Sequence, residues 1–454
     1  MNATPLLTAP IGRTMARLAA PNVMAMFVLL GTSMAEAWYV GQLGVTALAG
    51  LALAFPMMML TNMLSAGAIG GAVAGAVAQR LGAGDRAGAE TLAAQSVLLA
   101  LLAAAAFGIV FLGAGQQIYS QLGGRGAVLD SALAYSDVLF AGAVSLWLAN
   151  ILSSVVRACG QMRMAAFAMM LGSAIQIVAA GVLIFGIGPF PQLGIAGAAA
   201  GVVLGFAASS VLQLVYLASG RAGLRLHWRV SLHPGPLWSM LRVGLLASIS
   251  PFSSVATVII ITALVARFGD AALAGYGIGA RLEFLMIPLI FGIGAASITM
   301  VGVHFGAGEI DRGHRIAWTG AIAAALITGA VGGGLALFPG LWADLFTDSA
   351  AVREACRAYL RIVGPFYAFF GLGLCLYFAS QGARRVLWPV LAGLVRLAVI
   401  AVGGVLLLAG PAPRLSDLFV LIAGAMLAYG VLVAAAIRLG AWRAPAQTAA
   451  AAAR

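Results

Sequence analysis

Long apolar runs alternate with short polar breaks along almost the whole chain. Each run reaches about 20 residues or more, which as an α-helix crosses a hydrocarbon core about 30 Å thick. Runs this long and this continuously apolar do not fit the alternating strands of a membrane barrel. The pattern predicts twelve membrane-spanning helices, at residues 18–40, 47–79, 91–113, 131–156, 164–187, 192–217, 238–267, 272–305, 314–338, 351–379, 386–409 and 416–440.

The composition supports the same conclusion. Of 454 residues, 63% are hydrophobic and 8% are charged, whereas about 25% of the residues of an ordinary soluble domain are charged. The sequence therefore predicts an all-α integral membrane protein with little chain left for a soluble domain.

A formal net charge of +12 raises the question of a nucleic-acid partner, but the positions of the arginines argue against one. With a cytoplasmic N-terminus, seventeen arginines fall in inside segments and five in outside loops. This positive-inside bias predicts a multi-pass protein of the cell inner membrane with both termini in the cytoplasm.

The chain contains an internal duplication. Residues 40–44 and 47–50 recur as 265–269 and 272–275, at an offset of 225. Further landmarks then recur at an offset of 224: residues 82–85 as 306–309, Val128 as Val352, and Tyr135 as Tyr359. Because each repeat holds an even number of helices, six, the two repeats run in parallel, as in transporters with two lobes facing a central cleft.

The duplication defines the expected domains. They are an N-terminal tail (1–17), an N-lobe (18–217), a cytoplasmic linker (218–237), a C-lobe (238–440) and a C-terminal tail (441–454). An alternative is a signal peptide, because Arg13 and Arg17 precede an apolar stretch that ends in Ala35-Glu36-Ala37. The first helix has a counterpart in the seventh, deep within the chain, so we interpret it as a structural span.

A Gly-Ala-Gly-acid turn follows the second helix of each repeat. Its glycines allow the left-handed backbone that ends a helix, and its acid favours the positive start of the next helix. The residues of these structural turns are Gly82, Gly84, Asp85, Gly306, Gly308 and Glu309. The chain has no lysine, which excludes a Walker A site and Schiff-base chemistry. Its energy must then come from an ion gradient or a separate ATPase subunit.

The order of these motifs resembles the multidrug and toxic compound extrusion (MATE) family. The resemblance rests on Tyr39–Gly44, Ala47–Gly50, Phe55-Pro56 and Leu81–Asp85, on Arg281–Glu283 and Phe305–Glu309 in the second copy, and on Gln381-Gly382, Pro389 and Arg396. It covers about residues 13–443. It implies a V-shaped bundle of two lobes that exports amphipathic, often cationic organic molecules in exchange for protons or sodium. We expect a monomer that contacts membrane lipid and a small-molecule organic substrate.

Departures from the family pattern bear on the coupling ion. The family commonly has aspartate in helix 1, where this chain has Glu36. The places where many members carry Asn and Asp in helix 5 hold Gln176 and Ala180, and an acid of helix 7 maps to about Ser254. Most oxygen ligands of a sodium site are thus missing, and proton coupling without any metal or cofactor is expected.

Glu36 is the main candidate for that coupling. It lies about 19 residues, or some 28 Å, beyond Arg17 along helix 1. A charge at mid-bilayer costs about 2.5 to 3.5 kcal/mol on insertion scales, so its presence requires a reason. A carboxyl group there can take up a proton outside and release it inside. The alternative is a glutamate held in a permanent ion pair.

Arg281 and Glu283 are the corresponding candidates in helix 8. Two residues apart on a helix, they point to different faces, so we expect at least one to face the cleft, and a wholly structural role is the alternative. At an offset of 225, Glu36 corresponds to Ile261, and Glu283 to Met58. We therefore expect Glu36 to handle protons, while Glu283 attracts cationic substrate or relays charge.

Other residues receive smaller roles. Gln176, Met34 and Phe27 are candidates for the substrate cleft, because Met and aromatic side chains suit flat hydrophobic ligands. Asp137 and Arg361 are expected to reach water at helix ends. The three cysteines are core residues, and the four histidines lie in or near cytoplasmic loops: Cys159, Cys356, Cys375, His227, His233, His304 and His314.

Two other functions compete with drug export. A lipid-linked saccharide flippase of the same superfamily would offer several intramembrane cations to a pyrophosphate headgroup, but the deep cations here are chiefly Arg281 and Arg396. A membrane enzyme would need a metal cluster or a nucleophile with its base, and neither spacing occurs among the histidines and cysteines. The sequence thus predicts no catalytic residues.

Overall fold

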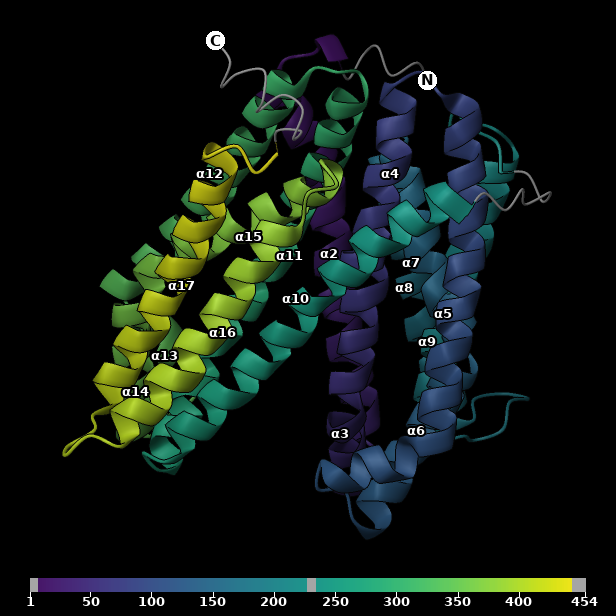
Figure 1. Cartoon of the computed structure of the whole chain (residues 1–454). Helices are drawn as coiled ribbons and strands as arrows, with labels where there is room; N and C mark the ends of the chain where they lie inside the picture. Colours follow the sequence, from purple (N-terminus) through teal and green to yellow (C-terminus); the bar gives the residue numbers. More distant parts are fainter. Residues whose placement is uncertain (1–6, 227–233, 443–454) are drawn as a thin grey trace. The chain divides into compact units, whose positions relative to one another are not determined.

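The chain is described by a computed structural model that covers residues 7–226 and 234–442. His227, His233 and most of the expected C-terminal tail lie outside these ranges. Within the described residues, every regular element is a helix (Figure 1). The elements of the first half are α2 (Ile11–Gly41), α3 (Val45–Asn62), the π-helix η1 (Met63–Ile69), α4 (Gly70–Gly82), α5 (Arg86–Gln121), α6 (Gly126–Ala141), α7 (Ala143–Ala158), α8 (Met162–Phe185) and α9 (Ile195–Ala218).

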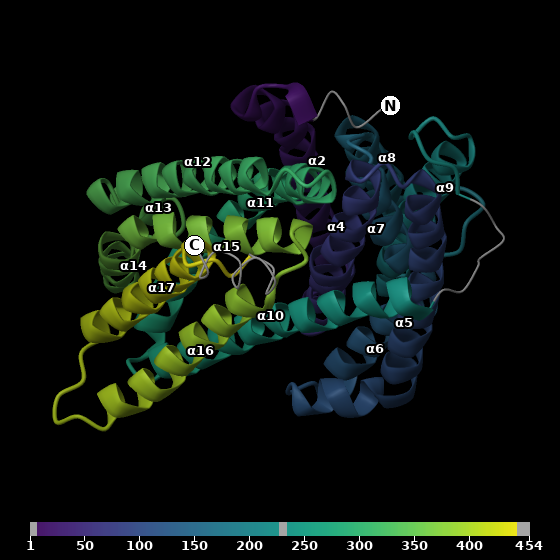
Figure 2. The ribbon, with the colours of Figure 1, turned by 45° about the horizontal axis from the view of Figure 1, so that its top comes forward.

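The described part of the second half has nine elements, as the first half has. Its elements are α10 (Pro234–Ala266), α11 (Asp270–Gly306), α12 (Ile310–Leu337), α13 (Gly340–Ala343), α14 (Ala350–Val363), the 3₁₀-helix η2 (Gly364–Phe366), α15 (Tyr367–Gly382), α16 (Leu387–Leu408) and α17 (Leu415–Arg438). In both views α11, α12 and α15 lie side by side (Figures 1 and 2).

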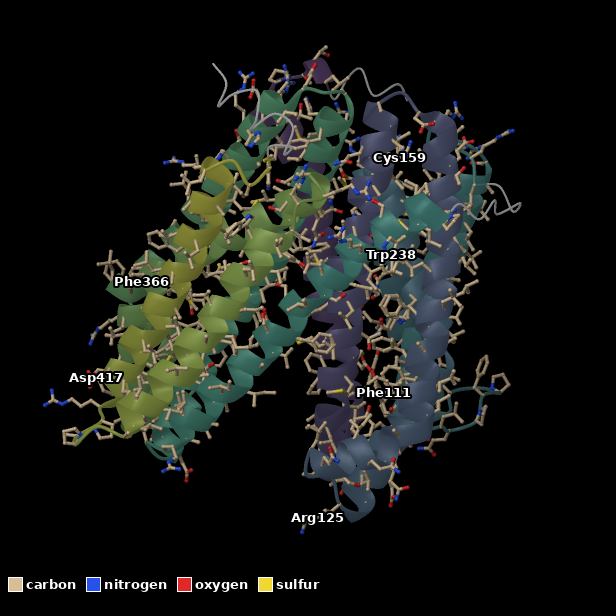
Figure 3. The ribbon with its side chains drawn as sticks, in the orientation of Figure 1. Phe111, Arg125, Cys159, Trp238, Phe366 and Asp417 are labelled. Carbon is tan, nitrogen blue, oxygen red and sulfur yellow. The ribbon has the colours of Figure 1, made fainter. Side chains whose placement is uncertain are left out.

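The described helices account for the predicted spans. Eleven are long and apolar enough to cross a membrane, and the pair α6 and α7, bent by 54°, makes up to twelve. Figure 3 shows Arg125, just before α6, and Cys159, just after α7, at opposite ends of the first half. The predicted all-α membrane fold is confirmed.

Two helix ends differ most from the prediction. The first helix begins at Ile11 instead of 18, and the third continues to Gln121 instead of 113. Hydropathy marks only the part of a helix that lies in hydrocarbon. A helix closes its hydrogen bonds within itself, so polar residues such as Arg13 and Gln116 can continue it beyond the apolar run.

The chain divides into two compact units. Among the described residues, one unit holds those up to Thr8 and from Arg17 to Gly244, and the other holds those from Ala9 to Ala16 and from Leu245 onward. In the second unit the Arg312 guanidinium donates a hydrogen bond to the Ala9 carbonyl at 2.8 Å. The division thus falls within α10, downstream of the expected linker at 218–237.

Glycines allow the closest helix packing in the first unit. Gly197, Gly201 and Gly205 lie along one face of α9, one turn apart, against α8. A Cβ at Gly201 would lie 2.7 Å from the Ala180 Cβ, and one at Gly205 would lie 2.5 Å from the Gly172 carbonyl oxygen. Small residues at this spacing let membrane helices approach backbone to backbone.

The duplication is visible in the same close approaches. Gly50 of α3 packs on Ser131 and Ala132, and Gly275 of α11 packs on their counterparts, Ala355 and Cys356. The fourth span of each half is interrupted at the matching place. The interruption is Gly142 in the first half and η2, which ends at Phe366, in the second (Figure 3).

Candidate functional site

Glu36 lies buried inside the first unit, with 5% of its surface exposed. The Tyr135 hydroxyl donates a hydrogen bond to its Oε1 at 2.7 Å, and the Gln176 amide donates one to its Oε2 at 3.2 Å. The same Tyr135 hydroxyl also lies 3.4 Å from the Met58 sulfur. Each oxygen of the carboxyl group thus has a neutral donor, and within the described part of the chain no cation pairs with it.

Four helices build this site. Glu36 shares the inward face of α2 with Thr32 and Val40, which are also buried. Tyr135 comes from α6, Gln176 from α8 and Met58 from α3. Because α6 packs on α3 through Gly50, the tyrosine hydroxyl is held where it reaches both α2 and α3. The permanent ion pair considered as the alternative for Glu36 is not formed among these residues.

The other candidates on α2 lie on a different face. Met34 is 68% exposed and Phe27 is 44% exposed, and they are seven residues, or two turns, apart. The structure therefore does not bring them to the Glu36 carboxyl group. Gln176, expected in the substrate cleft, is instead a hydrogen-bond donor to Glu36.

The structure also shows the positions at which many family members carry possible sodium ligands. Ala180, one turn from Gln176 on α8, packs against the backbone of Gly201 on α9. Ser254 belongs to α10 in the second unit. Neither position supplies a carboxylate to Glu36. Among the described residues, no group of three or more His, Cys, Asp or Glu side chains is arranged to hold a metal ion.

The second unit contains its own partly buried carboxylate. The Arg396 guanidinium on α16 lies 3.4 Å from Glu283 Oε1 on α11, and the two side chains are only 10% and 18% exposed. Arg396 also lies 5.2 Å above the Phe370 ring. Arg281 is exposed and lies 5.7 Å from the Phe346 ring centroid. Arg281 and Glu283 of α11 do point apart, as expected, but Glu283 already pairs with Arg396.

Tyrosines surround this pair. Tyr276, Tyr359 and Tyr367 are buried and lie close enough to Glu283 to interact with it electrostatically. The hydroxyls of Tyr359 and Tyr367 are 3.5 Å apart, and Tyr429 of α17 lies near Arg396. A charged pair is therefore embedded among hydroxyl groups in the core of the second unit.

The repeated turns differ in detail. Gly84 and Gly308 both have positive φ, 75° and 81°, where a side chain would be strained. The Asp85 carboxylate accepts a hydrogen bond from the Gly88 amide at 2.8 Å and from Arg80 at 2.7 Å. Glu309 makes no such cap, and its carboxylate lies 3.7 Å from His304 instead.

The first unit contains a polar network that the sequence did not predict. Asn150 donates to the Ser65 hydroxyl at 2.8 Å and to the Asn62 side-chain oxygen at 3.2 Å. Arg157, expected in a loop, ends α7 with only 5% of its surface exposed and donates to Ser154 at 2.9 Å. The asparagines inside apolar runs were the available signal.

Asn62 and Ser65 flank the start of η1, the π-helical turn that interrupts the second span. Such turns are rare and occur frequently at functional sites. The remaining membrane charges behave as expected from their positions, since Asp137 and Arg361 are both exposed.

Comparison with known proteins assigns the family. A profile of the MatE family matches residues 21–182 and 248–406. The chain is 26% identical to a FAD transporter of Shewanella oneidensis over 87% of each chain. It is also 26% identical to a probable multidrug resistance protein NorM of Thermotoga maritima, over 84% of this chain and 82% of that one.

Solved structures agree with the sequence comparison. A crystal structure of MATE in complex with MaD3S superimposes with a TM-score of 0.87 and 26% identity, covering 98% of this chain and 99% of that one. The family match spans most of both halves, and the structural match extends over nearly the whole chain. The chain therefore belongs to the MatE family of multi-pass membrane transporters.

Proposed function

We propose that this protein is a proton-coupled antiporter of the cell inner membrane that exports amphipathic, often cationic organic compounds by alternating access. The observation that carries the proposal is Glu36, a buried carboxyl group held by two neutral donors, Tyr135 and Gln176. A buried carboxylate without a counter-charge is costly, and binding a proton removes that cost. The protein is proposed to act as a monomer in lipid, without enzymatic activity.

The surroundings of Glu36 favour a proton over sodium. Among the described residues, the groups that bond to the carboxyl group are one hydroxyl and one amide, and no second carboxylate pairs with it. Ala180, at a place where many family members carry an acid, faces α9 and offers no oxygen. A proton needs a single basic oxygen, which Glu36 supplies.

In the proposed cycle, Glu36 takes a proton from outside and releases it to the cytoplasm, while substrate moves outward. The two lobes alternate between outward and inward opening about the connection between the sixth and seventh spans. Each pH unit supplies about 1.4 kcal/mol per proton, and each 100 mV about 2.3 kcal/mol per charge. One proton per cycle can therefore support a useful substrate gradient.

Substrate contacts are assigned to exposed candidates. Met34, Phe27 and Arg281 are exposed in the described structure and offer two adaptable apolar surfaces and a charge. Gln176 and Glu283, also predicted for the cleft, are engaged with Glu36 and Arg396. We assign them to those pairs, because a carboxylate that already has a guanidinium partner attracts a cationic substrate less strongly.

A second candidate substrate comes from the comparison. The Shewanella relative is a FAD transporter, so a flavin dinucleotide is an alternative cargo for this chain. Arg281 would then meet an anionic substrate in place of a cationic one. Because FAD is itself fluorescent, the same vesicles can test both cargoes.

The test is uptake of a fluorescent cationic dye into proteoliposomes, with an imposed proton or sodium gradient, for wild type and Glu36→Gln. Glutamine keeps the size of the side chain and an oxygen that accepts the Tyr135 hydrogen bond, but it cannot carry a proton. We expect proton-driven accumulation in wild type and its loss in the variant. Glu309→Gln is the matched control, since this acid is exposed and lies in a turn.

The other outcomes reject parts of the proposal. Sodium-driven accumulation would reject proton coupling. Accumulation of FAD without any dye would replace the cargo. Failure with every dye and with FAD would favour the lipid-linked saccharide flippase, to which Arg281 and Arg396 would offer cations within the membrane.

A further inference from the structure

The two halves place a carboxyl group beside the same repeat-related tyrosine, but from different helices. In the first unit, Tyr135 contacts both Glu36 of α2 and Met58 of α3. In the second unit its counterpart is Tyr359, and the counterpart of Met58 is Glu283, which lies near Tyr359. The counterpart of Glu36 is the apolar Ile261. In each half a carboxyl group therefore lies beside this tyrosine, but it belongs to the first span of the first half and to the second span of the second half.

The second site differs in having its own cation. Arg396 corresponds to Gly172 of the first half, where a side chain would collide with the carbonyl of Gly205 or its neighbours. In the second half, the Arg396 guanidinium lies 3.4 Å from Glu283. Both side chains are mostly buried. An arginine stays protonated in proteins, so the charge it brings is permanent.

We propose that Arg396 is a built-in counter-cation that keeps the carboxyl site of the second half neutralised, so that Glu36 alone exchanges a proton during transport. The inference rests on the proposed proton coupling at Glu36, and it limits the carboxyl groups that exchange a proton to this one. The guanidinium supplies the positive charge next to Glu283. Protonating Glu283 would leave the Arg396 charge mostly buried and without a counter-charge, so the pair disfavours uptake of a proton.

The groups that interact electrostatically with Glu283 agree with this assignment. They are Tyr276 from its own helix, Tyr359 from α14, Tyr367 from α15 and Arg396 from α16. Tyr429 of α17 faces the guanidinium, and Cys356 lies near Tyr367. Among these described neighbours Arg396 is the one fixed cation. Removing its charge should therefore convert Glu283 into a second protonatable site.

The first arm of the test is infrared difference spectroscopy of the purified, full-length protein during a pH titration. The signal is the carbonyl stretch of a protonated carboxylic acid. Wild type should show a buried-carboxyl band that Glu36→Gln removes and Glu283→Gln leaves unchanged. Arg396→Gln should add a second band, which is lost in the double variant Glu283→Gln/Arg396→Gln. Arg396→Lys keeps the charge and should show no added band.

The second arm measures the substrate gradient that balances an imposed pH gradient at zero membrane potential. Each coupled proton supports about a tenfold substrate gradient per pH unit. Arg396→Gln should raise the balancing gradient about tenfold per pH unit over wild type. The double variant Glu283→Gln/Arg396→Gln should return the balancing gradient to the wild-type value. This variant leaves neither charge of the pair unpaired, so it can be measured even if Arg396→Gln alone does not fold.

Three results would overturn the inference. The first is a wild-type band that disappears in Glu283→Gln, because Glu283 would then exchange protons with Arg396 in place. The second is a balancing gradient in the double variant below that of wild type. The third is a folded Arg396→Gln protein that adds neither a band nor a coupled proton. A wild-type spectrum without the Glu36 band would reject the proposed function alone, since the band added by Arg396→Gln belongs to Glu283.

Discussion

Single residues in the repeated turns show how one methylene group changes a helix start. Asp85 caps α5 through the Gly88 amide, whereas the longer Glu309 lies by His304 and leaves the start of α12 without a side-chain cap. The hydrogen bond from Gly88 and the one from Arg80 hold the pKa of the Asp85 carboxyl group below its ordinary value. Two turns with the same sequence pattern therefore differ in what their acids do.

We expect Asp85→Ala to lower the free energy of unfolding by about 1 kcal/mol at pH 7, the usual effect of losing an N-cap. A carboxyl group whose folded pKa is lowered stabilises above its unfolded pKa, about 3.9. That contribution is lost as the pH falls below this value toward the folded pKa. The difference between wild type and variant in a denaturant titration in detergent should therefore shrink at pH 3.5.

Glu309→Ala is the control for this prediction. It removes an exposed acid that makes no cap, so its effect should stay within about 0.5 kcal/mol. Equal destabilisation by the two substitutions would mean that the cap geometry does not decide the stability of these turns.

Among the elements, the contact between α8 and α9 depends most clearly on absent side chains. A methyl group at Gly201 would lie 2.7 Å from both the backbone nitrogen and the Cβ of Ala180. Neither atom belongs to a flexible side chain, so the helices themselves would have to separate. α8 also carries Gln176, and its position therefore matters for the hydrogen bond to Glu36.

Gly201→Ala should destabilise the protein by about 1 to 3 kcal/mol, the usual cost of overpacking a tight core. Gly333→Ala is the matched control, because it lies in a helix interior with no atom within 4 Å of its added Cβ. That control should be neutral or gain about 0.5 to 1 kcal/mol. Thermal unfolding in detergent measures both, and an unchanged melting temperature for Gly201→Ala would contradict the packing argument.

For the whole molecule, the orientation in the membrane remains a prediction from the arginine bias. We expect a fluorescent protein fused after Arg454 to fluoresce and alkaline phosphatase fused there to be inactive, because the C-terminus is predicted to be cytoplasmic. Alkaline phosphatase inserted between Phe185 and Ile195, in a predicted outside loop, should be active. The reverse pattern at both positions would contradict the predicted topology.

The sequence by itself determined the membrane class, the approximate spans and the duplication, and it singled out Glu36 as a charge within an apolar run. These follow from hydropathy and from spacing along the chain, which are local or periodic properties. The same signals located the turns at 82–85 and 306–309. They did not fix helix ends, because a helix can extend past the apolar run that reveals it.

Only the tertiary structure decided which side chains meet. Tyr135 is 99 residues from Glu36, and Arg396 is 113 residues from Glu283. Hydropathy cannot assign such pairs, since they depend on how helices rotate and pack, and glycine contacts such as Gly50 on α6 set that geometry. For the same reason the sequence could not show that Gln176 donates a hydrogen bond to Glu36 or that Glu283 pairs with Arg396. The sequence identified the buried charges, and the packing of distant helices decided which of them has a counter-charge.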